Sequence, residues 1–298
     1  MRTSARLAIP LVLFFGASFN SAQSSQPPIP PVQLAREVVY NELHDHSTHG
    51  YWRFRVTSHV QGRILVADQV ETKDGPVSRT ALADGKPLSA QYSQLEDARL
   101  LRLLHSPAEQ GQQRREHQQD EQRIGQILAQ LPDAFLFDYE GLQNNFFCLH
   151  FHPDPTYSSS SVEGRVFHAM SGTLMIDMHT RRLALLEGHV DNNVDFGYGI
   201  LGRVYKGGWF LLERTQVSPT EWKTKRLEIH MNIRALMVKS FTKETSETRG
   251  DFMRVASDTS LAQGILLLER ENNLATEPRV ADSATGPSMP ASAIPLHY

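Results

Sequence analysis

The chain has 298 residues, a formal net charge of −3 and a single cysteine, Cys148. So small a charge gives no basic field for nucleic acid and no strong attraction to an anionic membrane, and neither partner is expected. One cysteine excludes an internal disulfide, so the fold must be stabilised by its core.

The first 22 residues are typical of a secretory signal peptide. Arg2 and Arg6 precede an apolar run from Leu7 to Phe15, and small and polar residues follow it through Ala22. The run is too short to span a bilayer, and no later segment is long and apolar enough to do so. We therefore expect a periplasmic or extracellular protein with no transmembrane segment after cleavage.

Polar composition marks both ends of the remaining chain. Residues 23–31 are rich in Ser, Gln and Pro and predict a flexible lead, while residues 271–298 predict a disordered tail. Residues 32–270 are then expected to form a single domain, rich in β-structure. Apolar residues at helical spacing predict its first helix over 32–43 and its closing helix over 257–268.

The first half of this domain is predicted to contain strands followed by helices. Alternating apolar and polar residues predict three strands over 51–60, 63–72 and 77–83. Helical spacing then predicts a helical hairpin inserted at about 89–131, which ends at Pro132. Its polar portion between residues 109 and 122 is expected to be exposed.

A long antiparallel meander is predicted over residues 162–255, after strand-forming residues at 134–151. Leu227, Ile229 and Met231 alternate with polar residues, so one face of the sheet is expected to be buried. The apolar stripes of the inserted helices could cover that face. The expected strands span residues 165–178, 182–187, 194–205, 209–217, 222–231 and 235–243, with a turn at 232–234.

The order of these elements resembles that of a known superfamily over about residues 32–255. Together with the G-x-L-x-I-D run from Gly172 to Asp177, it is similar to the LolA-like periplasmic lipoprotein-sorting proteins. The runs 131–135, 196–202 and 206–208 are similar to those of an uncharacterised group of secreted acidobacterial proteins. The resemblance implies an α+β fold: a curved antiparallel half-barrel, a meander, with helices covering its concave face.

The resemblance also implies a function. Members carry lipids or lipoproteins towards the outer membrane in an apolar cavity between half-barrel and helices, so we expect a non-enzymatic lipid-binding protein without catalytic residues or cofactor. An arginine early in the sheet latches the helical lid in that superfamily, and both Arg53 and Arg55 could hold that position. The residues expected to line the cavity are Trp52, Phe54, Leu95, Ile124, Leu128, Phe137, Ile176, Leu227 and Ile229.

Histidines provide an alternative hypothesis. His44, His46 and His49 lie within six residues, and alternation puts His150 and His152 on one face of a strand. Neutral imidazoles that converge can share a zinc or copper ion, which would make this a metal-binding protein or a metal-dependent enzyme. A third hypothesis is an envelope signalling or interaction scaffold that binds an envelope protein.

Two other motifs are expected to be structural. The glycines at 197, 199 and 202 match a dinucleotide fingerprint, but the next residues predict a strand where that motif requires a helix, so a bend is expected. Cys148 lies in an apolar strand and is expected to be an inert core residue.

A basic clump near Trp209 and Trp222 consists of Lys223, Lys225 and Arg226. It is expected either to be a solvated face or to form a rim that meets acidic headgroups.

Overall fold

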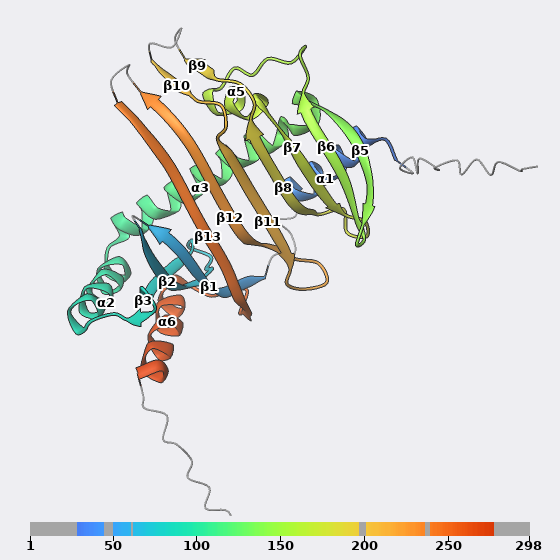
Figure 1. Cartoon of the computed structure of the whole chain (residues 1–298). Helices are drawn as coiled ribbons and strands as arrows, with labels where there is room; N and C mark the ends of the chain where they lie inside the picture. Colours follow the sequence, from blue (N-terminus) through green and yellow to red (C-terminus); the bar gives the residue numbers. More distant parts are fainter. Residues whose placement is uncertain (1–28, 45–49, 61, 197–200, 236–238, 277–298) are drawn as a thin grey trace, which may run out of the picture.

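A computed structural model shows an α+β fold built around one large antiparallel sheet (Figure 1). It describes residues 29–44, 50–60, 62–196, 201–235 and 239–276. The expected signal peptide, most of the expected lead and tail, His46 and His49 lie outside these residues, as do Gly197 and Gly199 of the expected bend.

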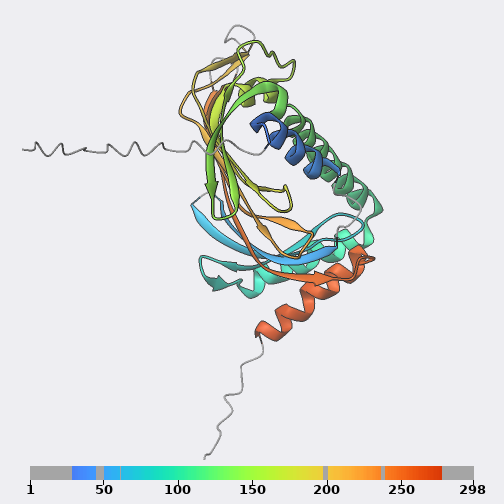
Figure 2. The same ribbon diagram turned by 90° about the vertical axis from the view of Figure 1, so that its right-hand side faces the viewer.

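The sheet is curved and is not closed into a barrel (Figure 2). Its strands follow the order β4-β3-β2-β1-β13-β12-β11-β8-β7-β6-β5, and β10 pairs with both β12 and β9. The first strand of the domain therefore pairs with the last. The strands are β1 (Tyr51–Val60), β2 (Arg63–Val70), β3 (Val77–Ala83), β4 (Lys86–Pro87), β5 (Phe135–Gln143), β6 (Phe146–Pro153), β7 (Met170–Asp177), β8 (Leu183–Val190), β9 (Val194–Phe196), β10 (Gly202–Val204), β11 (Trp209–Gln216), β12 (Trp222–Ala235) and β13 (Lys239–Val255).

Six helices accompany the strands in the described part of the chain. They are α1 (Pro31–His44), α2 (Ala90–His105), α3 (Pro107–Ala129), α4 (Leu131–Ala134), α5 (Val162–His168) and α6 (Leu261–Thr276). The predicted first helix and the three strands that follow it are confirmed as α1 and β1 to β3.

The predicted helical hairpin at about 89–131 is present as α2 and α3, and its polar portion at 109–122 lies within α3 and is mostly exposed, as expected. Ser106 caps this helix by accepting a hydrogen bond from the Glu109 amide at 3.3 Å, and Pro107 occupies the first turn, where its missing N–H costs nothing. The 23-residue helix buries none of its side chains. A long helix that buries so little of its surface is typical of a bridge between packed regions.

The meander also differs from prediction in three places. The first part of the strand expected over 165–178 is helix α5, because the Ser161 hydroxyl caps it by accepting from the Gly164 amide at 2.9 Å. The strand expected over 194–205 is split into β9 and β10. The turn expected at 232–234 lies inside β12, where Asn232 pairs with Thr242 of β13.

The largest core joins α1 to one face of the sheet. Leu34 and Val38 of α1 are fully buried against strands β6 and β7, which contribute Leu149, Phe151, Leu174 and Ile176. Ile127 and Leu128, at the end of α3, pack against the same cluster. We call this cluster the α1 core.

Strand register extends the face of the α1 core across the sheet. Leu212 of β11 packs against this core and lies opposite Leu227 of β12. Leu227 lies opposite Glu247 of β13, which in turn lies opposite Ser58 of β1. Directly opposed residues point to the same face and successive residues alternate, so Val56 points to this face as well. We call it the inner face.

Helices α2 and α6 pack on the opposite face. Ala67 of β2 lies opposite Val56, so Val70, three positions later, points away from the inner face, as does its partner Val77. These valines form the second core with α2 and α6, through Leu100, Leu103, Leu261, Ile265 and Leu268. The prediction that both inserted helices cover the inner side of the sheet is therefore wrong for α2.

Helix α3 connects the two sides of the molecule. It begins beside α2, passes across the sheet and ends beside α1 and α4 (Figures 1 and 2). No helix among the described residues is long and apolar enough to cross a membrane.

Candidate functional site

Of the nine residues predicted to line an apolar cavity, Leu227 is partly buried on β12, and the other eight fall into three groups. Leu128, Phe137, Ile176 and Ile229 belong to the α1 core or pack against it. Trp52 and Phe54 are buried in a separate cluster with Val56. Leu95 and Ile124 are 59% and 65% exposed and take part in none of these clusters, which corrects their predicted position.

A partly buried apolar strip remains on the inner face of the central strands. Phe210 of β11 lies opposite Ile229 of β12, and Leu212 lies opposite Leu227, and all four side chains are only partly buried. We call these four residues the β11–β12 strip. It lies between the α1 core and the Trp52 cluster, in a part of the sheet where α3 contributes no buried side chain.

Polar residues border this strip on β13. Glu247 lies opposite Leu227 and accepts a hydrogen bond from Arg249 at 2.9 Å. The Arg249 guanidinium also lies over the Phe54 ring, 5.7 Å from its centroid. An apolar strip beside a charged pair is suited to a ligand with an apolar body and a polar end.

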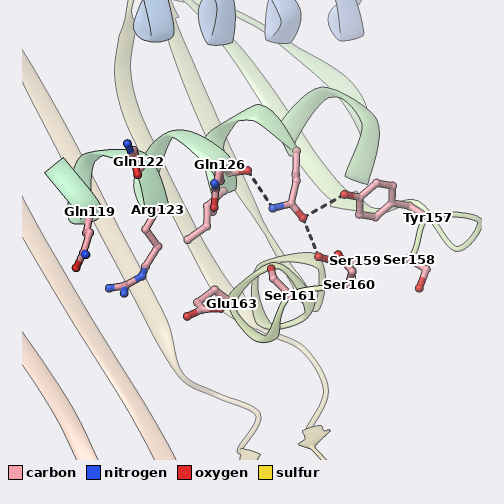
Figure 3. A pocket seen from close by; sticks show the side chains of 12 residues that line it. Gln119, Gln122, Arg123, Gln126, Tyr157, Ser158, Ser159, Ser160, Ser161 and Glu163 are labelled. Carbon is pink, nitrogen blue, oxygen red and sulfur yellow. Dashed lines mark hydrogen bonds between the residues drawn. The ribbon is translucent and has the colours of Figure 1, made fainter.

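A polar cavity of about 610 Å³ lies between α3 and α5 (Figure 3). Gln130, at the end of α3, joins several of its lining residues: its side-chain amide donates to the Gln126 carbonyl at 3.0 Å, and its side-chain oxygen accepts from Tyr157 at 3.1 Å and from Ser159 at 2.8 Å. The lining residues are Gln119, Gln122, Arg123, Gln126, Ile127, Gln130, Tyr157, Ser158, Ser159, Ser160, Ser161 and Glu163.

The described histidines do not form the predicted metal site. His44 lies at the end of α1, on the inner-face side, where it stacks on Tyr40 with ring centroids 4.2 Å apart. His150 and His152 alternate with the core residues Leu149 and Phe151 and so point to the outer face. Within the described residues, no group of three or more His, Cys, Asp or Glu side chains could hold a metal ion.

Ser171, His189 and Asp191 form a polar cluster that sequence analysis missed. Ser171 Oγ lies 3.2 Å from His189 Nε2, and Asp191 Oδ1 lies 3.0 Å from the same nitrogen. In a catalytic triad the serine and the carboxylate contact different ring nitrogens, so that one can accept a proton while the other is held. Because Ser171 and Asp191 both contact Nε2 of His189, this cluster does not have the geometry of a catalytic triad.

The predicted basic clump is neutralised by neighbouring carboxylates. Lys223 contacts Glu71 at 2.8 Å and Lys225 contacts Glu213 at 2.7 Å. Arg226 is similarly paired, 2.7 Å from Glu228. The charges of the clump are thus satisfied, and Lys225 and Arg226 are about half exposed, whereas the Lys223 side chain is only 18% exposed. Trp222 beside them is buried and Trp209 is 40% exposed.

Cys148 is buried, and burial raises the pKa of its thiol. A thiol with a raised pKa is mostly protonated at neutral pH and is a poor nucleophile. This agrees with the prediction of an inert core residue.

Neither arginine considered for the latch lies on the side of α1. Arg55 pairs with Asp68 at 3.0 Å, and alternation with Val56 puts Arg53 and Arg55 on the outer face. The anchor of α1 is instead Glu42, which contacts Arg214 and accepts from Arg182 Nε at 2.9 Å. Burial, the largest influence, opposes ionisation of Glu42, but the charge of Arg214 and the contacts with Arg182 together hold its pKa below the usual value.

Comparison with known proteins adds little to this geometry. No family model matches the sequence, and no curated protein matches it. Among solved structures, the chain is similar to that of a DUF1329 family protein from Desulfovibrio piger, at a TM-score of 0.26 and 9% sequence identity. The likeness covers 80% of this chain and 100% of that one, and at this TM-score nothing further is inferred from it.

Proposed function

We propose that this protein is an exported, non-enzymatic binding protein of the LolA-like superfamily, which holds the apolar chain of a lipid or lipoprotein. The ligand would lie along the β11–β12 strip. In this proposal the inner face is the concave side of a half-barrel, α1 closes one end of it, and α3 passes over the middle.

One observation carries the proposal. In the β11–β12 strip, Phe210, Leu212 and Ile229 pack against the α1 core, yet all four side chains of the strip are only partly buried, and α3 buries none of its own side chains. Burying a leucine or isoleucine side chain is worth about 1.5–3 kcal/mol, so a partly exposed strip of such residues favours a ligand that completes the burial.

The shape of the molecule supports the same reading. Helix α3 is held at its ends, by α2 at one side and by α1, α4 and α5 at the other. Its middle turns are exposed, as expected for a helix that spans an open region without packing on the strands beneath. A chain-like ligand could pass beneath it, with its polar end near Glu247 and Arg249.

Lipid analysis of the exported full-length protein tests the proposal directly. We expect native mass spectrometry to show a bound species at one-to-one stoichiometry, and solvent extraction to identify it as a lipid. A mass equal to that of the bare chain, together with failure to bind added fluorescent fatty acid, would contradict it.

A matched pair of variants then locates the ligand. Leu227→Gln alters the strip, whereas Leu211→Gln alters a partly buried leucine on the neighbouring strand that points to the outer face. Loss of one buried leucine contact predicts about tenfold weaker fatty acid binding for L227Q. L211Q should bind like the wild type, and equal losses in both variants would exclude the strip as the site.

A further inference from the structure

We infer that the polar cavity between α3 and α5 is a second binding site, independent of the strip, and that it takes a neutral ligand rich in hydroxyl groups, such as a saccharide. Its volume of about 610 Å³ lies in the range of small-molecule sites, about 300–1,000 Å³.

The chemistry of the lining selects this class of ligand. Glutamine side chains each offer two N–H donors and an acceptor oxygen, and serine hydroxyls both donate and accept. The cavity contains four of these glutamines and four of these serines, against a single aliphatic side chain, Ile127. A ligand complementary to such a wall must itself donate and accept at many positions, which is the property of a polyhydroxylated molecule.

The charges of the cavity argue against an anionic ligand. Arg123 of α3 and Glu163 of α5 both line it, from facing elements (Figure 3). The arginine is also paired with Asp120 at 3.3 Å. A phosphate or carboxylate site needs an excess of positive charge, which a facing carboxylate removes.

The part of the cavity around Gln130 and Ser159 is held in position by contacts within the protein. A Cβ at Gly164 would lie 2.0 Å from Ser159 Oγ and 2.5 Å from Gln130 Oε1, so the serine segment packs directly on the α5 backbone. The side chains of Ser159 and Gln130 are therefore already ordered in the free protein. Binding a ligand does not add the entropy cost of ordering them, which favours binding.

A second observation is that three of the lining glutamines, Gln119, Gln126 and Gln130, share one side of α3, which Gln112 continues beyond the cavity. Positions separated by seven or by four residues share a helix face. This side of α3 carries amides, where a helix that only packed on its neighbours would carry leucines. The pattern also explains how a helix so polar contributes to a specific site.

Titration calorimetry on the full-length protein tests the inference. The probes are maltose, cellobiose and N,N′-diacetylchitobiose, with inorganic phosphate as the anionic comparison. We expect saturable binding of at least one disaccharide and none of phosphate. Absence of disaccharide binding up to about 10 mM, or binding of phosphate alone, would overturn the inference.

Two variants on α3 identify the site. Gln126→Ala removes an exposed side chain of the cavity, and Gln112→Ala removes an exposed glutamine of the same helix outside it. Loss of one amide predicts about tenfold weaker disaccharide binding for Q126A and no change for Q112A. Equal affinity in Q126A and the wild type would place any sugar binding elsewhere. Fatty acid binding should be unchanged in both variants, so this site and the strip can fail separately.

Discussion

At the scale of single residues, the strongest electrostatic feature is the buried Glu42 between two arginines. Its side chain is 7% exposed, and that of Arg182 is 8% exposed. The Leu183 amide also donates to this carboxylate, at 3.0 Å. One α1 side chain is thereby tied to two strands that are not neighbours in sequence.

Glu42→Gln should destabilise the fold by about 3–5 kcal/mol, because it leaves two buried guanidinium groups without their counter-charge. Urea unfolding at pH 7 measures this loss. The control is Glu37→Gln on the same helix, whose 3.6 Å contact with Arg181 is partly exposed and should cost no more than about 1 kcal/mol. Equal losses in the two variants would show that the cluster of Glu42, Arg182 and Arg214 contributes no more to stability than a surface ion pair.

The same carboxylate predicts a pH dependence. The folded pKa of Glu42 is depressed, so its contribution is complete above the unfolded pKa of about 4.3 and declines as the pH falls through the lower folded pKa. The stability difference between the wild type and E42Q should therefore shrink in acid below about pH 4.3. A difference that stays constant or grows there in urea titrations would contradict the assignment.

Gly172 of β7 shows how closely two strands approach. A Cβ at this position would lie 2.0 Å from the Glu187 carbonyl oxygen of β8. Gly172→Ala should therefore lower the free energy of unfolding by about 1–3 kcal/mol, measured by thermal or urea unfolding. Gly250→Ala on β13 is the matched control, since a Cβ there meets nothing within 4 Å, and a similar loss in both would rule out the close contact as the cause.

At the scale of elements, α3 is a long helix that buries none of its own side chains. Gly111→Ala should stabilise it by about 0.5–1 kcal/mol, because alanine loses less backbone freedom in a helix and the new Cβ meets only the end of Arg115 at 3.4 Å. Amide hydrogen exchange across α3 should slow accordingly. Faster exchange than in the wild type would mean that this part of α3 is not helical in solution.

Local patterns predicted the elements that depend on local interactions. Helix α1 and strands β1 to β3 were predicted because their apolar spacing is regular over many residues. Helix α5 was missed because its seven residues follow a run of serines and its start depends on one capping hydroxyl, that of Ser161. The helical hairpin at 89–131 was predicted, but apolar spacing did not give the start of α3, because the first turns of this helix bury no apolar stripe.

The side of the sheet on which each helix packs could not be predicted from local patterns. The outer position of α2 depends on the register of β1 against β13, where Tyr51 pairs with Val255 across most of the domain. The polar cavity likewise combines residues 119–130 with residues 157–163, which have no common sequence pattern. The glutamine repeat of α3 was the one available sign of it.

At the scale of the whole molecule, two cores lie on opposite faces of one sheet. Ile176 belongs to the α1 core and Ile265 to the core formed by α2 and α6. Ile176→Val and Ile265→Val should each cost about 0.5–1.5 kcal/mol. Residues far apart without shared partners contribute independently, so the double variant should show the sum within about 0.5 kcal/mol in urea unfolding. A larger departure would mean that the sheet couples its two faces.

The pairing of β1 with β13 determines the order in which the strands can pair as the chain emerges. The early hairpins can form as soon as they emerge, but β1 keeps one bare edge until the last strand of the described residues, Lys239–Val255, has emerged as well. Closing so long a loop is slow and leaves an edge open to wrong partners in the meantime. A nascent chain stalled before residue 239 should therefore be the aggregation-prone species and the natural client of a chaperone.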